Sequence, residues 1–228
     1  RSGNASGITA SGTLTVGGNL EATTDANNGL INLGTLAVDG TVALTTNGTG
    51  NATVVILVRR RPPRSTRKES SAASDVYKRQ LAASTIDGDL TVRSGNASGI
   101  TDSGTLTVGG NLAAATDANN GTINLGTLAV DGTVALTTNG SGNATIVNDA
   151  GLTFAASTVG GNLAATVTTG NMTDSGALAI TGTTTLTTSA NNATIALDTT
   201  TNAFTGAVTI TTNDNSGTDA DVTIDGGT

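Results

Sequence analysis

The chain has 228 residues and a formal net charge of −7 at pH 7, with 31 glycines, two phenylalanines, one tyrosine and no cysteine, histidine or tryptophan. This composition excludes disulfides, thiolate metal sites and histidine as a general base. It also argues against a thick core, because wide cores are usually filled by aromatic side chains. A narrow interior of small aliphatic residues, repeated along an axis, is typical of a solenoid.

Residues 1–53 begin an internal repeat. They align without a gap with residues 93–145. The two copies differ at the pairs Ala10/Asp102, Glu21/Ala113, Thr23/Ala115, Leu30/Thr122 and Thr49/Ser141. A shorter unit recurs within each copy, made of two apolar residues in alternate positions, a glycine turn and a further apolar residue. It reads LTVGGNL from Leu14 and Leu106, LAVDGTV from Leu36 and Leu128, and more loosely from Ser84, Ser157 and Leu178.

These units predict short strands joined by tight corners. Leu14 and Val16 alternate with Thr13 and Thr15, as in a strand with one buried face. Corner residues such as Gly17-Gly18 tolerate positive φ, and no stretch has the apolar spacing of a helix. We therefore expect an all-β, right-handed parallel β-helix (β-solenoid) with coils of about 21–29 residues. The hand follows the strong preference of β-strand crossovers.

The apolar residue before each glycine turn gives the coil length. The steps Val16 to Val38, Ile86 to Val108 and Val108 to Val130 are equal, whereas Val130 to Val159 is longer and Val159 to Ile180 is slightly shorter. Stacked coils would place equivalent residues in interior ladders. We expect one ladder of Leu14, Leu36, Leu106 and Leu128, and a second of Val16, Val38, Val108 and Val130. Arg1 in place of a start methionine, and the strand-like ending TIDGGT, indicate an array that is uncapped at both ends.

Residues 54–80 interrupt the array, so we divide the chain into solenoid repeats at 1–53, an insert at 54–80 and continuing repeats at 81–228. The first copy holds residues 54–80 between Thr53 and Leu81, where the second copy holds only residues 146–153 between Thr145 and Phe154. If the extra residues of the first copy are subtracted, the two copies are separated by the same number of residues as the looser units that begin at Ser84 and Ser157.

The insert differs in composition from the rest of the chain. It holds eight of the ten Lys and Arg residues, both prolines and the only tyrosine. Its tail, SSAASDVYKRQ, resembles translated sequencing-adapter sequence, so we interpret the segment as non-native. The alternatives are a disordered insertion at a coil corner and a basic loop that binds nucleic acid or heparin. Such a loop would use Arg59, Arg60, Arg61 and Lys68.

No catalytic, cofactor-binding or metal-binding residues are assigned from the sequence. Outside the insert the only basic residues are Arg1 and Arg93. Carboxylate pairs can cleave glycosidic bonds, but Asp87/Asp89 and Asp219/Asp221 lie in turn-like contexts that favour solvated turn acids. Calcium is the metal that acidic corners would suit. Its candidate ligands are Asp39 and Asp131, which we expect to stack at equivalent corners, and the C-terminal Asp214, Asp219, Asp221 and Asp225.

Two further surface features have ordinary explanations. An ice-binding face needs threonines at the same outward positions in successive coils, and the row begun by Thr15 and Thr107 is interrupted by alanines at Ala37, Ala129 and Ala179. Asn-x-Ser/Thr sequons occur at Asn4, Asn47, Asn51, Asn96, Asn139, Asn143, Asn171 and Asn192. Turn chemistry alone generates such sequences in a chain rich in Asn, Ser and Thr.

The phrases TLTVGGNL, LAVDGTVALTT and STVGGNL resemble the β-strand repeats of filamentous-haemagglutinin-like adhesins and related autotransporter passenger repeats. The resemblance covers nearly everything outside 54–80. It implies a secreted or surface-displayed bacterial rod, an outer-membrane secretion partner, and adhesion to host-cell, glycan or matrix surfaces without nucleic-acid binding or membrane insertion. If the longest coils carry the binding surface, protruding loops near Thr46–Asn51 and Thr138–Asn148 are the expected contact points. The alternative is a fragment of a β-helical carbohydrate-active enzyme, a lyase or a hydrolase.

Overall fold

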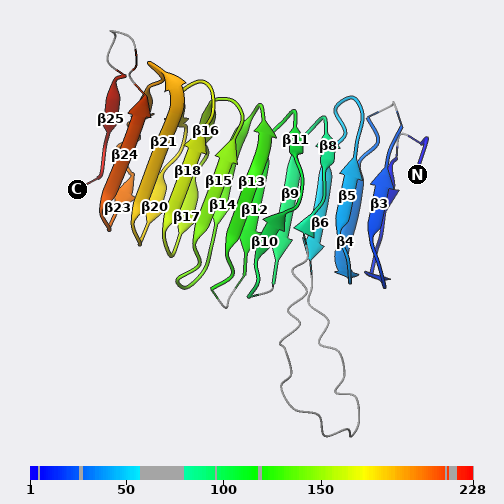
Figure 1. Ribbon diagram of the computed structural model, residues 1–228. Coiled ribbons are helices and arrows are strands. Elements are labelled where there is room, and N and C mark those ends of the chain that lie inside the picture. The colour runs from blue at the N-terminus through cyan, green and yellow to red at the C-terminus, as the bar shows by residue number, and fades with distance from the viewer. Residues whose placement is uncertain are drawn as a thin grey trace, which may run out of the picture.

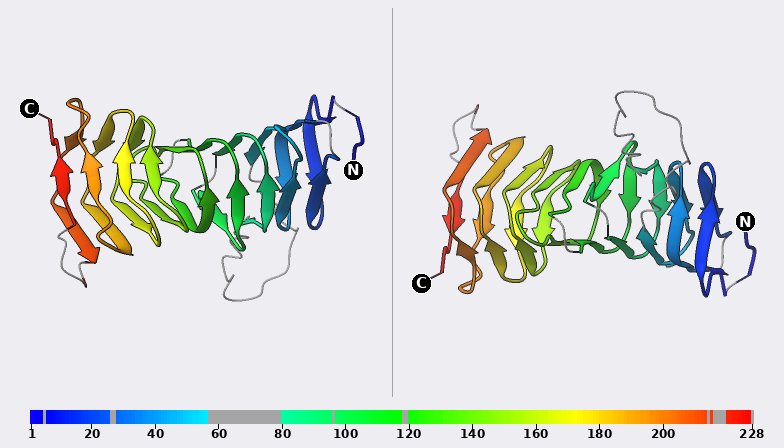
Figure 2. Two further views of the ribbon diagram at one scale, coloured as in Figure 1. Left: turned by 90° about the horizontal axis from the view of Figure 1, so that it is seen from above. Right: turned by 90° about the horizontal axis from the view of Figure 1, so that it is seen from below.

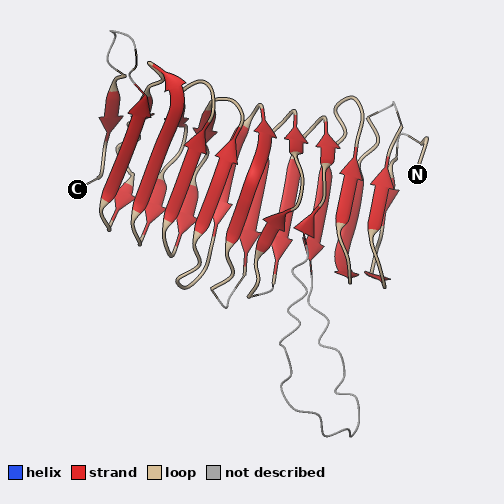
Figure 3. Ribbon diagram, viewed as in Figure 1, coloured by secondary structure: helices blue, strands red, loops and turns tan. Residues whose placement is uncertain are grey.

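The computed structural model describes residues 1–4, 6–25, 28–56, 80–95, 97–117, 120–213, 215 and 220–227. Within these residues every strand pairing is parallel and no helix occurs (Figure 3). The strands form two long sheets that face each other along the molecule, and the two termini lie at opposite ends of its long axis (Figures 1 and 2). The expected parallel β-solenoid is therefore confirmed, whereas the hand of its coiling stays a prediction.

Fourteen described strands make the first sheet, and eleven make the second. The first sheet contains β1 (Ile8–Thr9), β2 (Thr13–Val16), β4 (Ile31–Val38), β6 (Ala52–Ile56), β9 (Leu90–Ser94), β12 (Leu112–Thr116), β14 (Thr133–Thr137), β16 (Leu152–Phe154), β17 (Ser157–Val159), β19 (Met172–Asp174), β20 (Leu178–Ile180), β22 (Ile195–Leu197), β23 (Ala203–Phe204) and β25 (Val222–Ile224). The second contains β3 (Leu20–Thr23), β5 (Val42–Thr45), β7 (Gln80–Leu81), β8 (Ser84–Ile86), β10 (Ile100–Asp102), β11 (Leu106–Val108), β13 (Ile123–Val130), β15 (Ala144–Asn148), β18 (Leu163–Val167), β21 (Thr184–Asn191) and β24 (Val208–Asn213).

Each repeat copy contributes strands to both sheets, but equivalent strands of the two copies lie on opposite sheets. Leu14 pairs with Leu36 in the first sheet, whereas Leu106 pairs with Leu128 in the second. The expected single ladder of these four leucines is therefore wrong, and the same holds for the valine ladder two residues later. The physical reason is one of parity. The described chain passes back and forth between the sheets. From β2 to β11 it changes sheet seven times, which is an odd number, so each strand of the second copy arrives on the sheet opposite its equivalent.

Coil lengths follow from the pairing register. The equal steps are confirmed as single coils, since Val16 pairs with Val38 and Val108 pairs with both Ile86 and Val130. The longer step to Val159 covers one and a half coils, because β17 stacks on β14 of the first sheet and not on β13 of the second. The glycine motif therefore occurs at both edges of the solenoid. The number of residues between two motifs does not by itself give the length of one coil.

The coils continue in register across the expected insert. Val42 pairs with Leu81, whereas its counterpart Val134 pairs with Phe154, and the extra length of chain in the first pair equals the excess found between the copies. Strand β6 extends to Ile56 and buries this side chain against the core, and β7 begins at Gln80. Residues 57–79, including Arg59, Arg60, Arg61 and Lys68, lie outside the described residues, so the non-native origin of the segment stays a prediction.

The core is a thin double layer of aliphatic side chains. Inward residues of the two sheets form one continuous cluster, and Leu36, Leu106, Leu136 and Ile146 are each at most 1 % exposed. Phe154 is the one aromatic residue among the fully buried members of this described cluster, and the partly buried Phe204 packs against the cluster. Burying each Leu, Val or Ile stabilises the fold by about 1.5–3 kcal/mol. The described chain contains no helix that is long and apolar enough to cross a membrane.

Candidate binding surface

Side-chain amides and carboxylates at the corners hold successive coils together. The Oδ1 atom of Asn51 accepts a hydrogen bond from the N–H of Asp89 at 2.8 Å. Asp89 Oδ1 in turn accepts the N–H of Asn111 at 2.7 Å, and Asn111 Oδ1 accepts the N–H of Thr133 at 2.8 Å. This ladder joins coils on either side of the segment 57–79. It gives corner N–H groups partners that the sheets do not supply.

Glycines beside this ladder allow the coils to approach closely. Gly88, Gly110 and Gly132 stack on one another, and a Cβ atom on Gly110 or Gly132 would collide with the backbone of the preceding coil. These glycines are therefore required by stacking rather than by a positive φ. The recurring pair of a glycine followed by Asn or Asp therefore has a structural explanation. The glycine lets neighbouring coils approach closely, and the side-chain oxygen of the next residue accepts a hydrogen bond.

The two expected binding loops are tight corners. Thr46 and Thr138 are buried, and each hydroxyl donates a 2.6 Å hydrogen bond to a glycine carbonyl four residues on. The amides of Asn47 and Asn139 donate to backbone carbonyls of the preceding coil. Residues 144–148 are strand β15, not loop. The expectation of a loop is therefore wrong for residues 144–148, whereas the role of the two corners as contact points stays a prediction.

The described carboxylates of the pair Asp87/Asp89, which the sequence places in turns, have structural partners. Asp87 Oδ2 accepts the N–H of Gly48 at 2.7 Å, and Asp89 belongs to the corner ladder. Asp221 lies just before β25, and its partner Asp219 lies outside the described residues. The described members of the two carboxylate pairs, Asp87, Asp89 and Asp221, thus lie at corners, as the turn-like sequence around them indicated.

The proposed calcium ligands are not stacked as expected. Asp39 follows β4 of the first sheet, whereas Asp131 follows β13 of the second, so the two lie at different kinds of corner. Asp225 accepts the N–H of Gly227, and Asp214 is outside the described residues. Among described residues no group of three or more His, Cys, Asp or Glu side chains gathers in a way that could hold a metal.

Outward threonines are arranged differently from the expectation. Thr15 pairs with Ala37 in the first sheet and Thr107 with Ala129 in the second, so these interrupted rows lie on opposite faces. Threonine rows do occur in the C-terminal coils, where Thr187 of β21 lies between Thr166 and Thr211. The glycine motifs could not locate this row, because it is defined by register and not by a repeated phrase.

Several sequon asparagines fasten the coils. Asn51, Asn143 and Asn171 each accept a backbone N–H from the next coil through Oδ1. Asn96 lies outside the described residues. The abundance of Asn-x-Ser/Thr thus has a structural role, in agreement with the turn chemistry inferred from the sequence.

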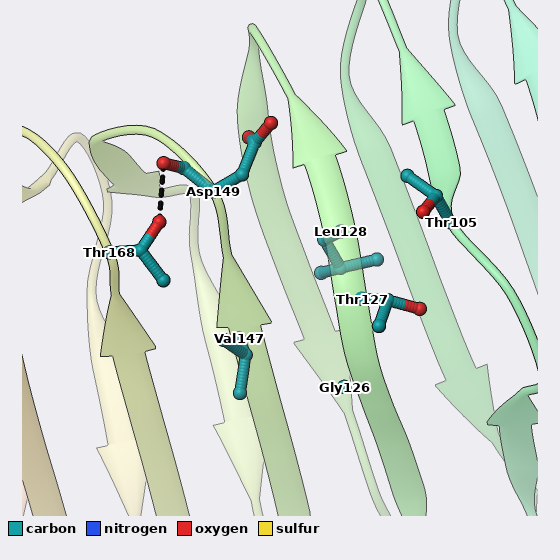
Figure 4. Close-up of a pocket in the computed structure, with 7 residues that line it drawn as sticks. All are labelled: Thr105, Gly126, Thr127, Leu128, Val147, Asp149 and Thr168. Carbon is teal, nitrogen blue, oxygen red and sulfur yellow. Dashed lines mark hydrogen bonds between the residues drawn. The ribbon is translucent and has the colours of Figure 1, made fainter.

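A shallow groove lies on the outer face of the second sheet and was not foreseen. It encloses about 270 Å³ across β11, β13, β15 and β18 (Figure 4). Its lining residues are Thr105, Gly126, Thr127, Leu128, Val147, Asp149 and Thr168. The groove follows from a β-bulge, because the pairing of β13 with β15 shifts register between Leu125 and Leu128. β-Bulges are often found beside functional sites, where they redirect side chains.

Asp102 holds this bulge in place. Its carboxylate accepts hydrogen bonds from the N–H groups of Gly126 and Thr127, at 3.0 and 2.8 Å, and from the Thr127 hydroxyl at 2.8 Å. The first repeat copy has Ala10 at this position, and there Gly34 adopts a φ of 52° and bonds to Asn32 instead. The single Ala10/Asp102 difference therefore changes how the two bulges are supported. The difference is visible in the sequence, but its structural effect depends on residues of the next coil.

Comparison with known proteins gives one match. No curated protein and no solved structure matches the chain. Residues 71–125 and 141–211, more than half of the chain, match a family described as repeats of unknown function (DUF5649). The matched regions include the groove strands β11, β15 and β18 and the regular coils on either side. The chain is thus a parallel β-solenoid that belongs to the DUF5649 family of repeats.

Proposed function

We propose that the chain is a rod segment of a large secreted or surface-displayed bacterial adhesin and that this segment performs no catalysis. The observation that carries the proposal is the continuous stacking of the coils. The core cluster extends through both sheets, and the corner side chains are used to bond one coil to the next. Such an array transmits force along its axis, because each coil is hydrogen-bonded to its neighbours by parallel strands.

The composition of the outer surface supports the same role. Both described arginines form exposed ion pairs, Arg1 with Asp25 and Arg93 with Asp117. The chain carries net negative charge, which favours solubility of an extended rod. The resemblance to filamentous-haemagglutinin-like repeats supports a location on the cell surface, export through an outer-membrane partner, and contact with host-cell, glycan or matrix surfaces.

The carbohydrate-active enzyme is the weaker alternative. An enzyme of this architecture would interrupt its coils with a cleft that gathers acids and bases, whereas Asp87 and Asp89 are bonded to backbone N–H groups. A screen of the full chain against polysaccharides, with release of reducing ends as the readout, tests this alternative directly. Turnover that disappears in Asp87→Asn or Asp89→Asn would favour the enzyme over the rod.

The rod is tested with the full chain in solution and on surfaces. Small-angle X-ray scattering should give an elongated particle of constant cross-section, with a rise of about 4.8 Å per coil. Beads coated with the chain should then adhere to epithelial cells or to immobilised matrix glycans more than beads coated with albumin. A compact particle would refute the rod. An elongated particle without adhesion would retain the rod and assign adhesion to other parts of a longer protein.

A further inference from the structure

Two of the three threonine hydroxyls that line the groove on the second sheet can act only as hydrogen-bond acceptors toward a ligand, whereas the hydroxyl of the exposed Thr105 can donate or accept. The Thr127 hydroxyl donates its hydrogen to Asp102, and the Thr168 hydroxyl donates its hydrogen to the backbone carbonyl of Asp149 at 2.6 Å. The hydroxyl hydrogens of Thr127 and Thr168 are therefore engaged within the protein, and only oxygen lone pairs of these two residues remain for a ligand. A molecule that hydrogen-bonds to Thr127 and Thr168 has to supply the hydrogens.

One negative charge faces this acceptor surface. Asp149 is exposed, and within the described part of the chain its carboxylate has no hydrogen bond or ion pair. Figure 4 shows its carboxylate turned away from Thr168, toward β13. The two described arginines are already paired with other aspartates, so neither neutralises Asp149. The net charge of the chain adds to the attraction of a cation toward this face.

The remaining lining is apolar and open. The half-buried Val147 supplies aliphatic surface, whereas Leu128 is buried in the core, and Gly126 leaves the hollow unfilled, since an added Cβ would have no atom within 4 Å. The volume of about 270 Å³ is at the lower limit of small-molecule pockets and suits a single sugar ring. Sugar rings combine hydroxyl donors around their edge with an apolar face of C–H groups.

The geometry points to a binding site for an amino sugar with a free ammonium group. The ammonium would pair with the Asp149 carboxylate, ring hydroxyls would donate to the oxygens of Thr127 and Thr168, and the apolar ring face would lie on Val147. The site goes beyond the proposed rod, because it assigns ligand binding to this segment itself. Its failure would leave the rod intact, since particle shape and ligand binding are measured separately.

The test is titration of the full chain with glucosamine, glucose and N-acetylglucosamine, followed by calorimetry or ligand-observed NMR. A pH of about 6 keeps an amine of this type protonated. Glucosamine should bind with a Kd on the order of 1 mM, because a ligand of this size has few atoms with which to offset its lost freedom. Glucose and N-acetylglucosamine, which lack the positive charge, should bind at least tenfold more weakly.

Three variants assign the binding to the groove. Asp149→Asn should weaken glucosamine binding about tenfold, the loss expected for a charged hydrogen bond, while Asp39→Asn removes an exposed carboxylate elsewhere and should leave binding unchanged. Gly126→Leu should fill the hollow and abolish binding without lowering the unfolding midpoint. Equal binding of glucose and glucosamine, or full binding by Asp149→Asn or by folded Gly126→Leu, would overturn the assignment.

Discussion

Replacing threonine by valine should have opposite effects at two buried positions of this solenoid. Thr138 is 2 % exposed, and its hydroxyl donates to the carbonyl of Gly142 at 2.6 Å and accepts the N–H of Gly160 at 3.0 Å. Thr184 is fully buried, and its Oγ1 has no hydrogen-bond partner among the described residues. Thr184 occupies an inward position between Leu163 and Val208 of the neighbouring coils. The same change of hydroxyl to methyl is therefore made in two different environments.

The expected magnitudes follow from hydrogen-bond accounting. Thr138→Val removes two hydrogen bonds and leaves a buried carbonyl and an N–H without their partner, which should cost about 1–3 kcal/mol. Thr184→Val removes an unpaired buried hydroxyl and adds apolar contact, which should stabilise the fold by about 1 kcal/mol. Both substitutions keep a β-branched side chain, so strand propensity and χ1 freedom change little.

Guanidinium unfolding followed by far-UV circular dichroism measures both variants against the parent chain. The midpoint should fall for Thr138→Val and rise for Thr184→Val, with similar slopes. Hydrogen exchange of amides in β21 and at the Thr138 corner would assign each change to its own coils, since stability in a repeat array is partly local. If Thr184→Val destabilises the chain as much as Thr138→Val does, then hydrogen bonding of these buried hydroxyls does not control stability, and the prediction is wrong.

Three other substitutions test the core, the corners and the surface. Leu136→Ala should destabilise the chain by about 3–5 kcal/mol, because Leu136 is fully buried in a thin core with few atoms able to fill the cavity, and a loss under about 1 kcal/mol would contradict this packing. Gly99→Ala should lower the midpoint strongly, because φ is 71° and the added Cβ would collide with the next coil, whereas Gly126→Ala should be nearly neutral in the same assay. Arg93→Ala should change the stability by less than about 0.5 kcal/mol, since its ion pair with Asp117 is exposed, and a larger loss in a double-mutant cycle with Asp117→Ala would show that the pair is coupled to the fold.

Much of the fold is encoded in local patterns of the sequence. Alternation such as Leu14-Thr15-Val16 predicts a strand with one buried face, and near-identical copies predict stacked coils. The excess of chain between the copies is also readable in the sequence, and the pairing of Val42 with Leu81 agrees with it. These features need no knowledge of distant contacts, because a period of two and a glycine corner are properties of neighbouring residues.

The candidate site could not be predicted in the same way. Its lining comes from four strands and their ends, and residues such as Thr127 and Asp149 become neighbours through coil stacking alone. Asp102 is one of five differences between the copies, yet its role appears only when β10 is placed beside the β13 bulge. The same limit applies to the threonine row through Thr187, which no repeated phrase marks.

The sequence by itself determined the class of this protein, an all-β parallel solenoid with glycine corners. Only the tertiary structure decided which sheet receives each repeat copy and which polar side chains support the corners. The reason is that a ladder joins residues that lie one coil apart in the sequence, and one more or one fewer change of sheet moves a whole copy to the opposite face. Local patterns determine where each strand forms. The number of residues and corners between strands determines which other strands each one pairs with.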